Sequence, residues 1–370
     1  MSASAERADD SSLQRTFRHA ALAAAVTCAA FAAGCASPPT TAENSPSVRH
    51  TLRALLPRGG GLEVGEFRVT RNEPLAPAVL TYKDARGSGQ VSASVRRLPV
   101  RDSEQLSLCP DLSEHPYSRC TLTRLENGAT LILDKSPVDE AKPSAGKRWT
   151  AVRTDRDGGQ IAVSESNTSN ERSSSPSRPT PPLSGRQLTD IVISARWKPV
   201  LAAIPSPPRG SSPVSSFQYL PAAKITDIIS RSVPRGLRTA DRGGAAGYGH
   251  LTVDDGRGRC LVAVTVQQWK PGDEALEEIF KGSAREADGT RVEITRSHPE
   301  KGGEGAVEWS VDTWRPDGLR IAVSELNAHA YRLPGTRRDP ALGVGRLKKI
   351  ALSEAWRAAL SEKNAERDRR

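Results

Sequence analysis

The pattern of apolar and polar positions occurs twice along the chain. Its clearest copies are residues 149–167 and 309–327, each a pair of alternating runs joined by a polar turn that contains Asp-Gly. Each copy begins at a tryptophan and ends in Ile-Ala-Val-Ser-Glu followed, one residue later, by Asn. Alternation with a period of two around an Asp-Gly turn predicts an antiparallel hairpin. The chain is therefore expected to contain a tandem duplication.

The segments around each hairpin also match in order. Apolar residues at helical spacing precede Pro-Arg-Gly in both copies, and β-branched runs on either side of a polar turn follow, over 80–95 and 251–266. A strand is expected over 128–133 and again over 289–294, and a closing helix ends near Trp197 and Trp356. Ser184 and Gln187 have the spacing of a capping box for the first of these helices. The glycine-rich run 243–249 is expected to be a mobile loop.

These elements predict an α+β fold. Each repeat is expected to be a mostly antiparallel sheet covered by helices on one face, because helices and hairpins alternate without the rhythm of a parallel sheet. Trp149 and Trp309 should each pack one face of the sheet. The expected order is a signal peptide (1–34), a flexible tether (35–47), repeat 1 (48–204), a Pro/Ser-rich linker (205–217), repeat 2 (218–360) and a charged tail (361–370).

The N-terminus has the features of an export signal. A polar start with Arg15 and Arg18 precedes a small-residue apolar run that is shorter than the about 20 residues needed to span a membrane. The run ends in Ala-Ala-Gly-Cys35, which resembles the lipobox of bacterial lipoprotein precursors. This resemblance implies cleavage before Cys35 and attachment of a lipid such as palmitate to its thiol. Ordinary secretion with cleavage after a small residue is the alternative, and Cys28 is disfavoured as the lipid site because it follows Thr27.

The order of the repeats extends this resemblance beyond the signal. Pro-Arg-Gly after an apolar helix, Asp-Gly-Arg-Gly before a strand and Pro340-Ala-Leu342 before the last helix are similar to segments of exported lipoproteins from high-GC Gram-positive bacteria. No catalytic role comes with that likeness. It implies an extracytoplasmic protein held at the cell membrane by its lipid.

Charge and cysteine content fit such a location. The formal net charge is +10, spread along the chain, which favours anionic envelope polymers or another envelope protein as partners and makes nucleic acid an unexpected partner for an exported protein. Cys109 and Cys120 lie in a polar loop and are expected to form a disulfide in an oxidising compartment. Cys260 precedes an apolar run and is expected to be a buried strand residue.

No sequence pattern indicates a cofactor or a metal. The histidines lack the spacing of a zinc motif, and Asp254-Asp-Gly-Arg-Gly is expected to be a hairpin turn and not a calcium loop. The duplicated Ser-Glu pairs are the strongest candidates for chemistry, with an arginine at a matching loop position in each copy. A structural ion pair or a cap is the main expectation for them, and a ligand contact is the alternative. The candidate residues are Ser164, Glu165, Arg178, Ser324, Glu325 and Arg337.

Two functions of different class remain open from the sequence. The preferred one is a non-catalytic binding or sensing lipoprotein whose loops 168–182 and 328–338 meet an envelope partner. The alternative is an envelope hydrolase or oxidoreductase with a site between the repeats. Such an enzyme requires Ser164, Glu165 and a histidine to converge in a cleft.

Overall fold

The structure is a computed structural model that describes residues 47–64, 77–99, 107–169, 175–207 and 219–368. Residues 46–370 form one compact unit. The signal peptide, most of the tether, Cys28 and Cys35 lie outside the described residues, as does most of the predicted linker. Within the described part of the chain, no helix combines the length and hydropathy that crossing a membrane requires.

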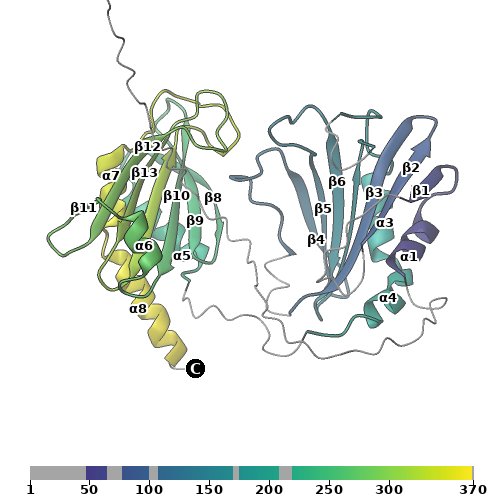
Figure 1. Ribbon diagram of the computed structural model, residues 1–370, viewed down its shortest axis with the longest axis horizontal. Coiled ribbons are helices and arrows are strands. Elements are labelled where there is room, and N and C mark those ends of the chain that lie inside the picture. Colours follow the sequence, from purple (N-terminus) through teal and green to yellow (C-terminus); the bar gives the residue numbers. More distant parts are fainter. Residues whose placement is uncertain (1–46, 65–76, 100–106, 170–174, 208–218, 369–370) are drawn as a thin grey trace, which may run out of the picture. The chain divides into compact units, whose positions relative to one another are not determined.

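Repeat 1 contains one seven-stranded antiparallel sheet in the order β1-β2-β3-β7-β6-β5-β4. Helix α1 precedes the sheet, and α3, the short 3-10 helix η2 and α4 follow it (Figure 1). The elements are α1 (Val48–Leu55), β1 (Gly61–Val64), β2 (Ala78–Asp84), β3 (Gly87–Arg97), β4 (Arg119–Arg124), β5 (Thr130–Pro137), β6 (Lys147–Thr154), β7 (Gly159–Ser166), α3 (Gly185–Ile193), η2 (Ala195–Trp197) and α4 (Lys198–Ala202).

Repeat 2 has the same topology, since its sheet reads β8-β9-β10-β14-β13-β12-β11 when started from its first strand. Each strand of repeat 1 therefore has a counterpart with the same neighbours. The elements are α5 (Ala222–Ser232), β8 (Arg238–Ala245), β9 (Tyr248–Asp254), β10 (Arg259–Gln268), α6 (Glu274–Ile279), β11 (Ala284–Arg285), β12 (Arg291–Ser297), β13 (Glu308–Trp314), β14 (Leu319–Leu326), α7 (Val344–Ala351) and α8 (Ala355–Asp368). The predicted α+β duplication is confirmed.

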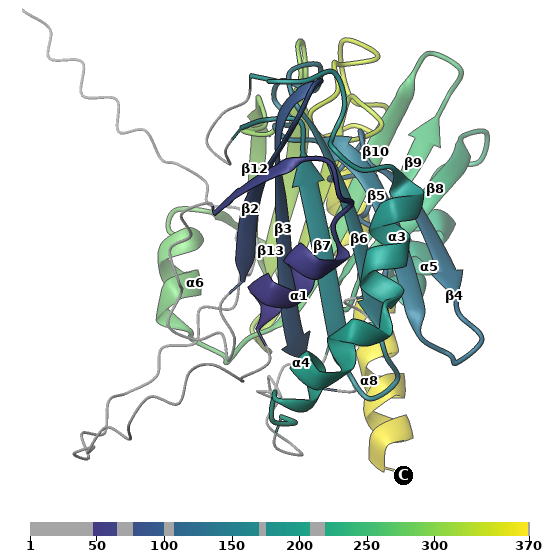
Figure 2. The same cartoon turned by 90° about the vertical axis from the view of Figure 1, so that its right-hand side faces the viewer.

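Helices cover one face of each sheet. In repeat 1, α1, α3 and α4 lie over β2, β3, β7 and β6 (Figure 2). In repeat 2, α5 packs on β8 and β9, and α7 packs on β13 and β14. We call the opposite side of each sheet, which in repeat 2 carries only the short helix α6 at one end, its helix-free face. Because successive side chains of a strand point to opposite faces, each strand contributes alternate residues to the core and to the helix-free face.

The two cores are built alike around a buried tryptophan. Trp197 and Trp356 are fully buried, and each indole Nε1 donates to a helix carbonyl, of Ile191 and Ile350 respectively, at 2.7 Å. Trp149 and Trp309, whose packing on the sheet was expected, are only partly buried at the edges of these cores. A cation lies over each of their rings, so they connect the core to solvent-facing charge.

Ser47 is the N-cap of α1. Two local predictions are corrected. The glycine-rich run 243–249 forms the β8–β9 hairpin, in which a Cβ on Gly249 would lie 2.7 Å from Ile225 of α5. Glycine is needed there for close packing of helix on strand and not for mobility. Helix α8 continues to Asp368, so most of the tail expected to fray is helical.

Candidate functional site

The duplicated Ser-Glu pairs do not form a site, because the two side chains point to opposite faces of the sheet. Glu165 of β7 is 1% exposed on the helix side, and Glu325 of β14 is fully buried. Ser164 lies on the helix-free face, where its Oγ is 2.9 Å from Thr150 Oγ1. This split follows from strand geometry, since neighbouring residues in a strand alternate in direction. A serine and a glutamate adjacent in a strand cannot act on one substrate.

Each buried glutamate holds the backbone that leads into the closing helix. Glu165 Oε2 accepts the Leu183 backbone N–H at 2.7 Å, while Oε1 has no hydrogen-bond partner among the described residues. Glu325 accepts backbone N–H groups of Ala341 and Leu342, at 2.8 and 2.9 Å. These bonds place the glutamates at the entry to α3 and α7.

Burial perturbs the ionisation of both carboxyl groups. Loss of solvent raises the pKa of Glu165 to about 8, against the opposing effects of the Leu183 N–H and of the Arg178 charge. The pKa of Glu325 rises to about 7, again because of burial, while the N–H groups of three residues, Leu342, Ala341 and Gly343, oppose the shift. The carboxyl group with more N–H donors, that of Glu325, has the smaller rise in pKa, as expected when hydrogen bonds stabilise the charged form.

The arginines at matching loop positions pair with other acids. Arg178 Nη2 lies 3.1 Å from Asp84 Oδ2, and Arg337 Nη1 lies 2.8 Å from Asp255 Oδ1. Each aspartate belongs to the β2–β3 or the β9–β10 turn, so the arginine fastens the loop to that hairpin. The ion pair expected between each glutamate and its arginine is therefore absent. The partner of each arginine comes from a turn that is close in space but distant in sequence.

The asparagine two residues after each glutamate also holds the following loop against the sheet. Asn167 Oδ1 accepts the Lys147 backbone N–H at 2.7 Å, and its Nδ2 donates to the Arg178 carbonyl at 3.0 Å. Asn327 makes the same two kinds of bond, with Val307 at 2.8 Å and Arg337 at 2.7 Å. These repeated residues serve to hold a loop against a sheet. Their duplication reflects a shared structural need.

The convergence required by the enzyme alternative is not found in the described parts of the chain. The ring of His250 does meet an acid from the other repeat, with Nε2 at 2.8 Å from both carboxylate oxygens of Asp111. His250 is only 4% exposed, and its Nδ1 has no hydrogen-bond partner among the described groups. A general base needs access to a nucleophile and a substrate. This pair instead fastens the repeats together.

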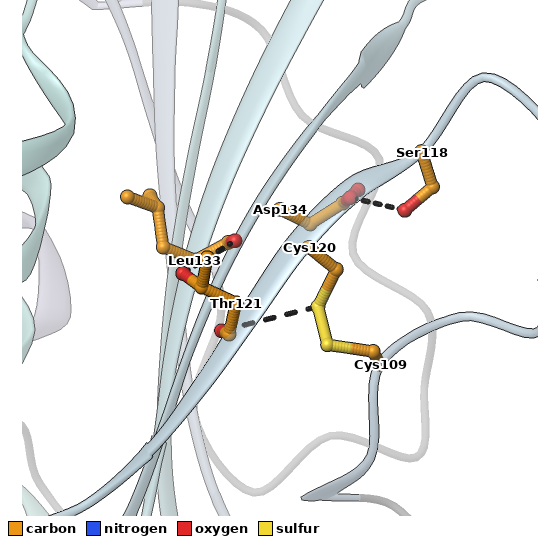
Figure 3. The surroundings of a disulfide bond; sticks show 6 residues. All are labelled: Cys109, Ser118, Cys120, Thr121, Leu133 and Asp134. Carbon is orange, nitrogen blue, oxygen red and sulfur yellow. Dashed lines mark hydrogen bonds between the residues drawn. A yellow bond between two sulfur atoms is a disulfide. The ribbon is translucent and has the colours of Figure 1, made fainter.

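The loop that carries Asp111 is stapled to the sheet edge by the predicted disulfide. Cys109 is bonded to Cys120 of β4, with their Cα atoms 5.7 Å apart, which confirms the expected pairing (Figure 3). On the same loop, the Ser113 carbonyl accepts the Tyr331 backbone N–H at 2.9 Å. The contact with His250 also lowers the pKa of Asp111 to about 2, although burial of the carboxyl opposes the shift. We call residues 107–118 the disulfide loop.

An open groove of about 600 Å³ lies beside the disulfide loop on the helix-free face of repeat 1. Ile132 of β5 and Val152 of β6 form an apolar part of its floor, and these two residues are paired in register. Leu108 and Pro110 of the disulfide loop line one wall. The groove has the volume of a typical small-ligand or peptide-side-chain site.

Most charged groups in the groove are already paired. Asp134 accepts the Ser118 hydroxyl at 2.5 Å, as Figure 3 shows, and Asp139 accepts a backbone N–H at 2.9 Å. Glu140 lies between two cations, 2.9 Å from His115 Nδ1 and 2.6 Å from Arg332 Nε.

Arg148 of β6 differs from these groups. It lines the groove and has no ion-pair or hydrogen-bond partner among the described residues. A guanidinium that is half-buried without a partner offers five N–H donors in a fixed planar fork. Arg148 is therefore the group in the groove best placed to receive an anion.

In repeat 2, the position equivalent to Arg148 is covered by the chain itself. Glu308 stands where repeat 1 has Arg148, and the Tyr331 hydroxyl donates to Glu308 Oε1 at 2.8 Å. Tyr331 and Leu333 pack on a small apolar cluster that includes Leu261. At the other end of the sheet, α6 and Trp314 form a further apolar cluster. The positions equivalent to Ile132 and Val152 are Glu293 and Asp312 in repeat 2, so the apolar floor of the groove has no counterpart there.

The sequence held a signal for this site that the pattern analysis missed. The residue before the hairpin tryptophan is Arg148 in one copy and Glu308 in the other, a reversal of charge inside the best-matching segment. This reversal changes the charge that the equivalent position carries in the two copies. The sequence alone does not show whether Arg148 or Glu308 lacks a partner, because that depends on contacts between residues that are distant in sequence. No group of three or more His, Cys, Asp or Glu side chains that could hold a metal ion occurs among the described residues.

Comparison with known proteins gives little. No protein-family model matches the chain, and no curated protein matches it. Similar solved structures include MucB in complex with MucA(peri), 12% identical over 82% of this chain and 96% of that one, with a TM-score of 0.17. The MucA/MucB complex of Pseudomonas aeruginosa gives 12% identity, 79% and 89% coverage and a TM-score of 0.17. The di-domain ARO/CYC BexL from the BE-7585A biosynthetic pathway is 11% identical over 74% of this chain and 96% of that one, with a TM-score of 0.15. Scores of this size do not establish a common fold or role.

Proposed function

We propose that this protein is a lipid-anchored extracytoplasmic binding or sensing module, without catalytic activity, that receives an envelope partner in the groove of repeat 1. The observation that carries the proposal is the open groove of repeat 1, which combines the apolar residues Ile132 and Val152 with an Arg148 guanidinium that has no partner among the described residues. Sites for recognition are concave, partly apolar and equipped with a few polar groups, as this groove is.

The proposed extracytoplasmic, lipid-anchored location is supported by features of the sequence. The Ala-Ala-Gly-Cys35 motif and the Ser/Pro/Thr-rich segment after it support an anchored protein with a flexible tether. The basic charge of the chain would draw it towards anionic surfaces or polymers of the envelope. We expect the envelope partner to be another protein, because the groove combines apolar and charged surface.

The anchor is tested by metabolic labelling with radioactive palmitate in a host that makes lipoproteins. The full chain should take up label and Cys35→Ser should not, while Cys28→Ser should label as the full chain does. Globomycin, which inhibits the lipoprotein signal peptidase, should make the unprocessed precursor accumulate. Equal labelling of the Cys35→Ser variant would reject Cys35 as the lipid site.

The binding role is tested by site-specific photo-crosslinking in intact cells. A photoreactive benzoylphenylalanine at Val138, which lines the groove, should yield a discrete adduct after irradiation. The same residue at Arg196, which is exposed and outside the groove, is the matched control and should give none. The absence of an adduct specific to Val138 would count against a binding groove at this place.

A further inference from the structure

Resting on the proposed function, we infer that the groove of repeat 1 is complete only when repeat 2 is docked on the disulfide loop, so that docking of the repeats controls binding in the groove. The disulfide loop couples the two events, because it lines the groove and also contacts repeat 2. The inference concerns how the proposed binding site is regulated and does not depend on the identity of the partner.

Three parts of the chain build the groove. Leu108, Pro110 and His115 come from the disulfide loop, and strands β5 and β6 of repeat 1 form the floor. Arg332, which also lines the groove, belongs to repeat 2. Without repeat 2 in place, the groove therefore lacks one of its lining side chains and one of its positive charges.

Glu140 of repeat 1 joins the three parts. Its carboxylate lies 2.9 Å from His115 Nδ1 of the disulfide loop and 2.6 Å from Arg332 Nε of repeat 2. Arg332 has a φ of 65°, a left-handed conformation that is unfavourable for a residue other than glycine. Its backbone N–H donates to the Lys301 carbonyl at 2.6 Å. This strained turn holds the guanidinium against Glu140, and undocking would leave that carboxylate in the groove without its arginine.

The contacts between the disulfide loop and repeat 2 are concentrated in residues 111–114. They are polar and comprise Asp111 with His250 Nε2 at 2.8 Å, the Ser113 carbonyl with the Tyr331 N–H at 2.9 Å, and Glu114 with Lys301 Nζ at 3.4 Å. The Cys109–Cys120 bond ties the start of this segment to β4 of repeat 1. A shift of the segment therefore changes the docking contacts and the groove wall at Leu108 and Pro110 together.

Docking of the repeats is only weakly favoured. No apolar cluster among the described residues contains members of both repeats. Two atoms of the docking residues, Ser113 Oγ and His250 Nδ1, are buried and have no hydrogen-bond partner in the described part of the chain. Such groups lose hydration without compensation, which opposes docking. A ligand that contacts Arg332 in the groove would favour the docked arrangement, and docking would raise the affinity for that ligand to the same extent.

The backbone amide of Tyr331 reports on docking directly. It donates to the Ser113 carbonyl across the repeats, whereas the amide of Asn327 donates to the Val307 carbonyl within repeat 2, at 3.0 Å. Hydrogen–deuterium exchange of the purified protein, read by mass spectrometry with electron-transfer fragmentation, follows both amides. Exchange at Tyr331 measures separation of the repeats, and exchange at Asn327 measures the integrity of repeat 2.

Asp111→Asn should speed exchange at Tyr331 about tenfold and leave Asn327 unchanged, because a charge-assisted contact with His250 becomes a neutral one. Asparagine keeps the side-chain oxygen that accepts the Ser113 N–H, so the turn of the loop is preserved. Asp190→Asn is the matched control. Asp190 is exposed on α3, on the other side of the sheet from the groove, and its variant should exchange as the parent does.

The Cys109→Ser/Cys120→Ser variant tests the disulfide loop independently of charge. It should also speed exchange at Tyr331 without affecting Asn327. Dithiothreitol should bring the parent to the exchange rate of this variant and leave the variant unchanged.

The effect on the groove is measured by the photo-adduct of benzoylphenylalanine at Val138 in intact cells. The yield of adduct should fall at least about fivefold in Asp111→Asn and in the double serine variant, and stay at the parent level in Asp190→Asn. Unchanged exchange at Tyr331 in both variants, or faster exchange with an unchanged adduct, overturns the inference and leaves the proposed function standing. Faster exchange at Tyr331 and Asn327 alike shows unfolding of repeat 2 and also overturns it. If Val138 gives no adduct in the parent, the proposed function fails, and this inference fails with it.

Discussion

At the scale of single residues, the most conspicuous repeated group is a buried glutamate. Glu165 and Glu325 are surrounded by core and receive only backbone N–H donors. The sequence showed that they recur and favoured an ion pair or a cap, whereas the structure gives them backbone N–H donors at the entry to the closing helices and pairs the arginines with aspartates. It could not show that Ser164 points to the helix-free face. Nor could it show that Arg178 pairs with Asp84, which lies in a turn distant in sequence. Pairing across the sheet depends on register, which short segments do not determine.

These carboxyl groups make the stability of the fold depend on pH. The pKa of Glu165 is raised from 4.5 to about 8, so between these values the folded protein holds a proton that the unfolded chain releases. The contribution is therefore most favourable below about 4.5 and is lost as the pH rises through 8. Glu325, with a pKa of about 7, loses its contribution over a slightly lower range.

Glu165→Gln should therefore change the stability most at high pH. Glutamine keeps an acceptor for the Leu183 N–H and cannot ionise, so the variant should match the parent near pH 5 and exceed its melting temperature near pH 9. Glu325→Gln should show the same trend with a smaller gain. Thermal unfolding followed by circular dichroism between pH 5 and 9 measures it. A constant difference at all pH values would show that Glu165 is not protonated in the fold.

At the scale of elements, the hairpins were the easiest features to predict. Asp-Gly turns between alternating runs gave the β6–β7 and β13–β14 pairs directly, and the capping box of Ser184 and Gln187 is present as expected. The β8–β9 hairpin was missed because its glycines were attributed to mobility, when they allow α5 to approach β9. The groove was missed for a different reason. An unpaired Arg148 is recognised only when the partners of Asp134 and Glu140 are known.

The disulfide loop should be the element most sensitive to reduction. The bond closes a loop of 11 residues in sequence separation and is expected to contribute about 2–3 kcal/mol by restricting the unfolded chain. The Cys109→Ser/Cys120→Ser variant should lose that amount of free energy of unfolding in urea titration. Dithiothreitol should lower the parent to the level of the variant and leave the variant unchanged. A variant as stable as the oxidised parent would show that contacts of the loop hold it without the bond.

At the scale of the whole molecule, two separate cores are joined by polar contacts. The core around Trp197 and the core around Trp356 share no residue. The described contacts from the disulfide loop and Glu140 to repeat 2 are ion pairs and hydrogen bonds, such as Glu114–Lys301 and Glu140–Arg332. Exposed or partly exposed ion pairs contribute little individually. Each repeat should therefore hold most of its own stability.

Truncation of one buried tryptophan should leave the other core largely intact. Trp197→Ala and Trp356→Ala should each cost about 3–5 kcal/mol, because each removes a fully buried side chain and its hydrogen bond. The costs should add within about 0.5 kcal/mol in the double variant, as for distant sites. Differential scanning calorimetry should show one of two transitions shifted by each single change. A shift of both transitions by one change would show tight coupling between the repeats.

The tyrosine that closes the face of repeat 2 has a consequence for valency. As long as Tyr331 covers Glu308, the described residues offer one groove of this kind, and under the proposed function each chain would bind one partner. Tyr331→Ala would uncover Glu308, and calorimetric titration with a lysine-containing peptide should then report a new stoichiometric event. One substitution would in that case convert a receptor for one partner per chain into a receptor for two.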